Sequence, residues 1–292
     1  MLSKIMALIV AVVSFISNFA GLIPAKEEIY YNVSYGSYTR QVLDVAFPAS
    51  QEEESGVILF LHGGGWISGD KSSFTETAIN MSRKTGCIAA SMNYRYVSEK
   101  VDCEKMLEDI DKALEKISSM AEIRGIKTTK VMLAGFSAGA HLATLYAYSK
   151  KNTAPIKPAA VIAYSVPTDL SSKNFIEKNK FNTPEGMLSI VSKVVGEKIT
   201  TANFNSKKSL IMKYSPINYV SSSCVPTIVA QGKNDAIVNI EDTKKFVSKL
   251  KKNSVTYQYF EYPNSAHSLN GDPDMTALTT KTFVEYVNKY VK

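Results

Sequence analysis

The chain has 292 residues, of which 45% are hydrophobic and 21% are charged. This composition provides for a large buried core, and it excludes a disordered chain, a fibrous protein and a polytopic membrane protein. The net charge is +7, but the lysines are scattered and form no stripe with interleaved aromatic residues. We therefore expect a solvated basic surface and no nucleic-acid partner.

The first 25 residues differ from the rest of the chain. Lys4 precedes an apolar stretch that extends from Ile5 to about Ile23. A positive residue followed by an apolar segment is typical of a secretory signal peptide, although the length also approaches the ~20 residues that span a bilayer. We expect residues 1–25 to be a signal peptide of a secreted or extracytoplasmic protein. A retained membrane anchor is the first alternative, and a buried core helix is the second.

Three cysteines, Cys87, Cys103 and Cys224, are present in this long chain. Their odd number and their spacing match neither a disulfide scaffold nor a zinc site, so at least one thiol is free in a monomer. Cys87 opens an apolar run, which predicts that it is a small buried hydrophobic residue.

After the leader, the sequence predicts an antiparallel pair of strands and then alternating strands and helices. The pair is expected within 31–48, on either side of a Gly-Ser turn. The later strands are expected within 56–65, 87–96, 130–134, 158–170, 226–231 and 255–267. The helices are expected at 73–85, 102–123, after 139, at 241–252 and from about Pro273 to the end.

This alternation predicts an α/β fold with a mostly parallel, doubly wound sheet and an antiparallel N-terminal edge. Residues 26–292 are expected to form one domain. Residues 171–214 are polar and lysine-rich, and we expect short helical pieces at most in this candidate small lid. In such sheets the active site lies at the carboxyl ends of the strands, so the polar residues that follow each strand are candidates.

Ser137 is the candidate nucleophile. It lies at the centre of Gly135-Phe136-Ser137-Ala138-Gly139, with a predicted strand before it and a predicted helix after it. In a G-x-S-x-G turn the flanking glycines make room for a strained serine at the top of the sheet. The alternative is an ordinary helix N-cap, which would not need those glycines.

A serine nucleophile needs a base, and the chain has only three histidines. His62 lies within a glycine motif and His141 lies about one turn beyond Ser137 on the same helix, so we expect structural roles for both. His267 follows the last strand, at the same edge of the sheet as Ser137. His267 is therefore the candidate base.

The acid that orients the base is expected to be Asp235. It follows the strand next to that of the histidine, and it gives the chain order serine, aspartate, histidine. Asp169 follows the preceding strand and is the alternative. It could instead cap the following segment or shape the pocket.

The glycine run at 62–66, "HGGGW", directly follows an apolar strand. Attack on an ester produces a negative oxygen, which bare backbone N–H groups can stabilise. Ala138, directly after the nucleophile, would supply one such group, and the glycine loop suits the others. Phosphate binding is disfavoured, because neither G-x-x-x-x-G-K-[ST] nor G-x-G-x-x-G is present.

Five motifs occur in order, namely "HGGGW…GDK", "NYRY", "GFSAGAHLA", "GKNDAIV" and "NSAHS". Over about residues 30–290 the chain thereby resembles the α/β-hydrolase fold, and within it BD-FAE-like bacterial acetyl esterases and carboxylesterases related to hormone-sensitive lipase. The resemblance implies no metal or organic cofactor. The residues that it implies are the nucleophile Ser137, the base His267, the acid Asp235 and the oxyanion-hole amides of Gly63, Gly64 and Ala138.

The resemblance also implies a serine carboxylesterase for short, acetyl-type acyl groups on a small molecule or a polysaccharide. Lipase-type relatives carry a long N-terminal helical cap, for which this chain has too short a segment. Kynurenine formamidases share a similar glycine motif, so an amide hydrolase or exopeptidase is an alternative, as is a non-catalytic binding protein. Trp66 is expected to line the pocket or pack below the loop, and Asp70 and Lys71 to fix the loop.

Overall fold

The structure is a computed structural model that describes residues 26–49, 52–179 and 182–292. The predicted signal peptide or anchor at 1–25 lies outside the described residues. Among the residues that are described, no helix is both long enough and apolar enough to cross a membrane.

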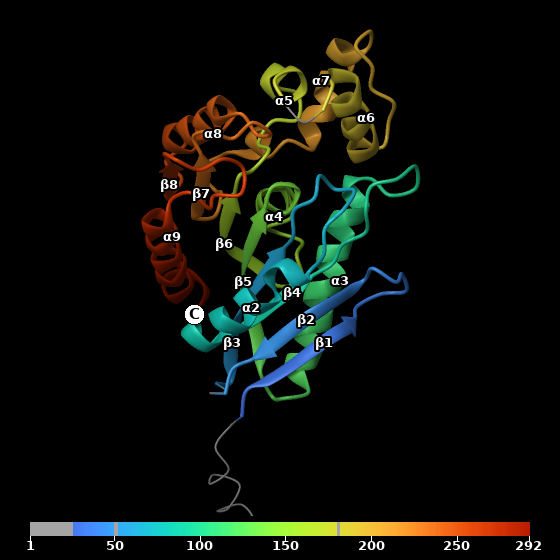
Figure 1. The fold of residues 1–292 in the computed structure, drawn as a ribbon. Coiled ribbons are helices and arrows are strands. Elements are labelled where there is room, and N and C mark those ends of the chain that lie inside the picture. The colour runs from blue at the N-terminus through green and yellow to red at the C-terminus, as the bar shows by residue number, and fades with distance from the viewer. Residues whose placement is uncertain (1–25, 50–51, 180–181) are drawn as a thin grey trace, which may run out of the picture.

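One eight-stranded sheet forms the centre of the described chain (Figure 1), in the order β1-β2-β4-β3-β5-β6-β7-β8. β2 pairs antiparallel with both β1 and β4, and every other pairing is parallel. The predicted mostly parallel sheet with an antiparallel N-terminal edge is therefore confirmed. The strands are β1 (Glu28–Ser34), β2 (Val42–Phe47), β3 (Glu54–Leu61), β4 (Ile88–Met92), β5 (Lys127–Phe136), β6 (Lys157–Tyr164), β7 (Thr227–Gly232) and β8 (Tyr257–Tyr262).

Helices cover both faces of this sheet, so central strands such as β3, β4 and β7 are almost wholly buried. The first face carries α2 (Ser72–Thr85) and α9 (Pro273–Tyr286), which continues as a turn of π-helix (Val287–Val291). The second face carries α3 (Cys103–Glu122), α4 (Ala138–Ser149) and α8 (Ile240–Lys252). All three cysteines are free and buried, and Cys87 packs in the core of the first face, as predicted.

The segment 171–214 is more helical than predicted. It contains α5 (Lys173–Glu177), α6 (Pro184–Val195) and α7 (Phe204–Lys213), which gather beyond one end of the sheet in Figure 1, and a short 3₁₀ turn (Pro216–Tyr219) follows. The expectation of short helical pieces at most is therefore wrong.

Local signals explain why α6 forms. The Thr183 hydroxyl accepts a hydrogen bond from the Gly186 N–H, and Pro184 occupies the first turn, where its missing N–H costs nothing. Gly196 ends the helix with a φ of 72°. One face of α6 is apolar and buried, and it comprises Met187, Leu188, Val191, Val194 and Val195.

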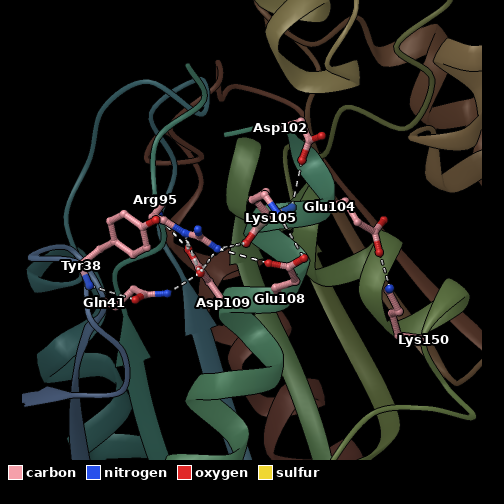
Figure 2. Close-up of polar contacts among 9 residues, drawn as sticks. All are labelled: Tyr38, Gln41, Arg95, Asp102, Glu104, Lys105, Glu108, Asp109 and Lys150. Carbon is pink, nitrogen blue, oxygen red and sulfur yellow. Dashed lines mark hydrogen bonds and ion pairs between the residues drawn. The ribbon is translucent and has the colours of Figure 1, made fainter. Parts of the chain in front are cut away.

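A buried polar network joins the β1–β2 hairpin, the segment after β4 and α3 (Figure 2). Asp109 of α3 is fully buried and lies 2.6 Å from an Nη of Arg95, while its carboxylate also accepts the Arg95 backbone N–H at 2.8 Å. Gln41 donates its amide to Asp109 at 2.8 Å, and the Arg95 guanidinium lies over the Tyr38 ring. Three segments far apart in sequence are thereby fixed to one carboxylate.

We expect Asp109→Asn to lower the free energy of unfolding by about 3–5 kcal/mol, because it keeps the shape but leaves a buried guanidinium without its counter-charge. Urea denaturation of the full chain measures this loss. Glu108→Gln is the matched control on the same helix, because the Glu108 side chain is 44% exposed and lies 3.7 Å from Arg95. The control should stay within about 0.5 kcal/mol of the wild type, and equal losses for the two variants would contradict the assignment.

Candidate active site

The candidate nucleophile Ser137 lies on a strained turn between β5 and α4, with φ 53° and ψ −119°. A β-carbon at Gly135 would lie 2.4 Å from the backbone of Gly139, and one at Gly139 would lie 2.2 Å from the carbonyl oxygen of Leu61. Both glycines are therefore required by the close approach of backbones. The side chain of Ser137 makes no capping hydrogen bond to α4, so the ordinary N-cap alternative is wrong.

The structure brings Ser137, His267 and Asp235 together from three loops at one edge of the sheet. Nε2 of His267 lies 3.0 Å from Oγ of Ser137, and Nδ1 of His267 lies 2.8 Å from Oδ2 of Asp235. The Asp235 side chain is fully buried, whereas 17% of the His267 side chain is exposed. The arrangement places an imidazole between a hydroxyl and a carboxylate.

Asp235 is oriented by several donors besides His267. Its Oδ1 accepts the backbone N–H groups of Ile237 and Val238 at 2.8 and 2.9 Å, and its Oδ2 accepts the side-chain amide of Gln231 at 2.8 Å. Sequence reasoning missed Gln231, which is the one polar side chain near the end of the apolar strand β7. A polar residue at the end of an apolar strand was the available signal in the sequence, and the structure shows that it is fully buried.

Asp169, the alternative acid, has a local role in the structure. Its carboxylate accepts hydrogen bonds from the backbone N–H and the hydroxyl of Ser171, at 2.8 and 2.7 Å. Among the described residues, it makes no hydrogen bond to His267. Asp169 therefore caps the segment that leads into α5, which was one of the two alternatives expected for it.

Two further residues that the sequence did not single out hold the loop of His267. The Ser165 hydroxyl, which follows β6, donates to the backbone carbonyl of His267 at 2.8 Å. Asp272 accepts from the Ser265 hydroxyl at 2.6 Å and from both the backbone and side-chain nitrogens of Asn264. His267 thus lies on a short loop that is hydrogen-bonded at both of its ends.

The glycine loop after β3 needs its glycines for different reasons. Gly64 has a φ of 116°, and a β-carbon there would lie 2.1 Å from the Ser68 carbonyl oxygen. Gly63 packs against Phe136, whereas Gly65 has a φ of 59° but faces open space. Among the described residues, no acceptor takes a hydrogen bond from the N–H groups of Gly63, Gly64 and Ala138. These amides are therefore available to a bound group.

Trp66, which was expected to line the pocket or to pack below the loop, is only 3% exposed. Its indole N–H donates to Nδ1 of His141 at 3.3 Å, and its ring meets His141 and Phe175 edge-on. Nε2 of His141 donates in turn to the Tyr214 carbonyl at 2.6 Å. The buried His141 is therefore structural, as expected, and it links the glycine loop to the end of the segment 171–214.

Asp70 and Lys71 fix the far end of the glycine loop, as expected. Asp70 accepts the backbone N–H of Ser72 at 3.0 Å and the side-chain amide of Asn93 at 2.8 Å. The ammonium of Lys71 lies 2.7 Å from the carboxylate of Asp44, and both side chains are nearly buried. Within the part of the chain that the structure describes, no group of three or more metal-ligating side chains could hold a metal ion.

The two buried histidines predict a pH dependence of stability. Burial lowers the pKa of His141 and of His62 to about 4, against an ordinary value of 6.5. Below pH 6.5 the unfolded chain gains protons that the folded chain rejects, so the free energy of unfolding falls as the pH drops from 6.5 to 4. Each histidine should contribute about 3 kcal/mol to this loss.

Urea denaturation at a series of pH values measures this dependence. His141→Gln should have a lower stability at pH 7 but a shallower decline toward pH 4, because one of the two groups has been removed. An unchanged slope in this variant would contradict the assignment of His141 as a group that stays neutral on folding.

Comparison with known proteins shows the family of this chain. The BD-FAE family model matches residues 43–250. LipM of Mycobacterium tuberculosis (strain ATCC 25618 / H37Rv), described as a probable carboxylic ester hydrolase, is 26% identical over 274 residues. The match covers 88% of this chain and 61% of LipM, so the chain spans about three fifths of that relative's length.

Solved structures share the fold. Esterase B from Lactobacillus Rhamnosis superimposes with a TM-score of 0.71 at 19% identity, covering 99% of this chain and 95% of its own. A truncated carbohydrate esterase from gut microbiota superimposes with a TM-score of 0.70 at 18% identity, covering 90% and 98%. Since the family model also matches more than half of the sequence, the chain belongs to the BD-FAE family and has the α/β-hydrolase fold.

Proposed function

We propose that the protein hydrolyses carboxylic esters of short, acetyl-type acyl groups through Ser137, His267 and Asp235. The observation that carries this proposal is the continuous hydrogen-bonded series from hydroxyl to imidazole to carboxylate, with distances of 3.0 and 2.8 Å. Membership of the BD-FAE family and the similarity to LipM support it. The geometry meets the requirement for an activated nucleophile, whose base is itself oriented by a third group.

The first step follows from the tautomer of His267. A carboxylate only accepts hydrogen bonds, so Asp235 holds the proton of His267 on Nδ1 and leaves Nε2 free to accept. Nε2 then takes the proton of Ser137 as Oγ forms a bond to the acyl carbon. Asp235 stabilises the resulting imidazolium without becoming protonated itself.

Negative charge develops on the carbonyl oxygen during this attack. The N–H groups of Gly63, Gly64 and Ala138 would accept that charge, and removing one such donor typically raises the barrier by about 3 kcal/mol. His267 then protonates the leaving alcohol as its bond to the acyl carbon breaks. A water molecule repeats the sequence on the acyl-enzyme and releases the carboxylic acid, with no cofactor or metal required.

The acyl preference rests on the modest size of the candidate lid, the segment 171–214. Its helices α5 and α6 contact each other, and they pack against α8 and α3 respectively. The alcohol part of the ester would belong to a small molecule or to a polysaccharide. The structural likeness to a carbohydrate esterase makes an acetylated polysaccharide a substrate to test. We further propose that residues 1–25 direct export or, if retained, anchor the protein in a membrane.

The catalytic roles predict a graded loss of activity on p-nitrophenyl acetate. Ser137→Ala should lower kcat by at least about 10⁴-fold, because no nucleophile remains. Asp235→Asn should lower kcat by about 10³-fold or more, because the imidazole loses its tautomer and its counter-charge. Steady-state kinetics of the folded variants measures both losses.

Asp169→Asn is the control for the acid, since Asp169 follows the neighbouring strand but caps a local turn, and its kcat should stay near the wild-type value. Wild-type activity in folded Ser137→Ala would exclude the proposal. Failure of a fluorophosphonate probe to label Ser137 would instead favour a non-catalytic binding protein on this scaffold.

A series of p-nitrophenyl esters tests the acyl preference. We expect kcat/KM to be highest for acetate and to fall as the acyl chain lengthens, because a small lid offers little surface for a long chain. Acetylated xylan and a matched acetanilide extend the series to polysaccharide esters and to amides. A maximum at long acyl chains would contradict the short-acyl proposal, and faster cleavage of the amide would favour the amide-hydrolase alternative.

A further inference from the structure

Arg40, a half-buried residue on the hairpin between β1 and β2, contacts the glycine loop although it is distant from that loop in sequence. Nε of Arg40 donates to the Tyr94 carbonyl at 3.1 Å, and Nη2 donates to the Gly69 carbonyl at 3.2 Å. The same Nη2 lies 3.2 Å from Nε2 of His62. The guanidinium also lies 3.7 Å above the centre of the Tyr96 ring, which fixes its plane.

These contacts determine the tautomer of His62. A guanidinium is always protonated and only donates, so Nε2 of His62 must accept from Arg40 and carry no proton. The ring proton is therefore on Nδ1, which donates to the Gly63 carbonyl at 2.6 Å. His62 is fully buried, and its ring stacks on that of Tyr94 at 4.3 Å and 14°. The stacking opposes rotation of the imidazole out of this arrangement.

The hydrogen bond from His62 to the Gly63 carbonyl also sets the direction of an amide. The Gly63 carbonyl and the Gly64 N–H belong to one planar peptide unit, and in a trans peptide they point in opposite directions. The described part of the chain contains no cis peptide bond. When His62 holds the carbonyl on one side of the loop, the Gly64 N–H must face the other side, where no described residue accepts from it.

The loop passes directly beside the nucleophile turn. A β-carbon at Gly63 would lie 3.3 Å from the carbonyl oxygen of Phe136, which is the residue before Ser137. On the opposite side, a β-carbon at Gly69 would lie 2.2 Å from the Gly63 carbonyl oxygen and 2.5 Å from Nδ1 of His62. Gly69 therefore packs directly against the hydrogen bond between His62 and Gly63. Its backbone leaves no space for another group to bond to Nδ1 of His62 or to the Gly63 carbonyl from that side.

We propose that Arg40 and His62 are positioning residues of the esterase reaction, Arg40 by fixing the neutral Nδ1–H tautomer of His62 and His62 by directing the Gly64 N–H toward the oxyanion. The inference rests on the proposed function, because the direction of this amide matters only if a negative oxygen forms beside it. Neither side chain touches the reacting atoms.

Arg40 is itself placed by the buried network of the hairpin. The neighbouring Gln41 is fully buried, donates to Asp109 of α3, and accepts the backbone N–H of Tyr38 at 3.1 Å (Figure 2). A β-carbon at Gly36 would lie 2.1 Å from the Gln41 amide oxygen, so the turn closes tightly on that side chain. The two adjacent residues thus have different roles. Gln41 fixes the hairpin to α3, and Arg40 extends from the hairpin to His62.

On balance the surroundings of His62 favour its neutral form. Arg40 lies on one side of the ring, Asp70 is the nearby carboxylate, and the phenols of Tyr94 and Tyr96 complete the set. Burial is the largest influence and lowers the pKa of His62 to about 4, with Arg40 acting in the same direction. The hydrogen bond to the Gly63 carbonyl and the Asp70 carboxylate act in the opposite direction and are outweighed. A protonated His62 would present a second N–H to a guanidinium, and this contact would be repulsive.

The tautomer can be measured without any enzyme assay. Long-range ¹H–¹⁵N correlation spectra of the histidine-labelled full chain distinguish a protonated Nδ1 from a protonated Nε2. We expect His62 to show the Nδ1–H form and His141 the Nε2–H form, which supplies an internal comparison. An Nε2–H signal from His62 in the wild type would overturn the inference, whether or not the protein hydrolyses esters.

A double-mutant cycle tests the proposed action of Arg40 through His62. Arg40→Met should lower kcat on p-nitrophenyl acetate by about tenfold with little change in KM, because only a transition-state contact is disturbed. The side-chain amide of His62→Asn can donate to the Gly63 carbonyl in place of Nδ1 but has no tautomer to fix. In that background Arg40→Met should therefore cause no further loss, whereas independent effects would multiply and would overturn the inference.

Two controls complete the design. Arg83→Met removes an arginine whose side chain is 54% exposed and pairs with Glu27, and it should leave kcat unchanged. His62→Ala, which has no donor, should lose more activity than His62→Asn, and by about 10²-fold relative to the wild type. Equal activity of these two variants would count against the inference. An inactive wild type with a labelled Nδ1–H tautomer would instead exclude the proposed function.

Discussion

The close approach of three backbones at the carboxyl edge of the sheet is the constraint on which the rest of the site depends. At this point α4 begins directly against the end of β3, and Gly139 leaves no space for a side chain between them. Because of this contact, the strained turn of Ser137 and the glycine loop lie next to each other. A nucleophile and a set of bare amides can share one small volume only if the intervening backbone carries no side chains.

Hydrogen bonds from distant segments hold these closely packed loops in place. Two of the donors are neutral, buried histidines, and each connects a different part of the chain to the glycine loop. His141 joins it through Trp66 to the carbonyl of Tyr214, and His62 joins it to Arg40 of the N-terminal hairpin. The histidines are useful here because a neutral imidazole can donate on one side and accept on the other.

The sequence predicts the parallel sheet and the meeting of Ser137, His267 and Asp235, because residues that follow parallel strands must gather at one edge. It could not supply Ser165 or Arg40, whose partners depend on long-range packing that no local pattern encodes. The helix α6 is a different case, since its Thr-Pro start, its C-terminal glycine and its apolar face were all present in the sequence. There the lysine-rich composition concealed a helical periodicity.

The position of the β1–β2 hairpin has a consequence for where this protein can be cut. The family match begins at residue 43, inside β2, so it excludes β1 and the turn that carries Arg40 and Gln41. A chain truncated to begin at residue 43 would keep Ser137 and Asp235 but would lack β1. The strand β2 would then be the edge of the sheet, and its unpaired backbone hydrogen-bonding groups would favour aggregation. The region that matches the family is thus shorter than the smallest fragment of the chain that we expect to fold.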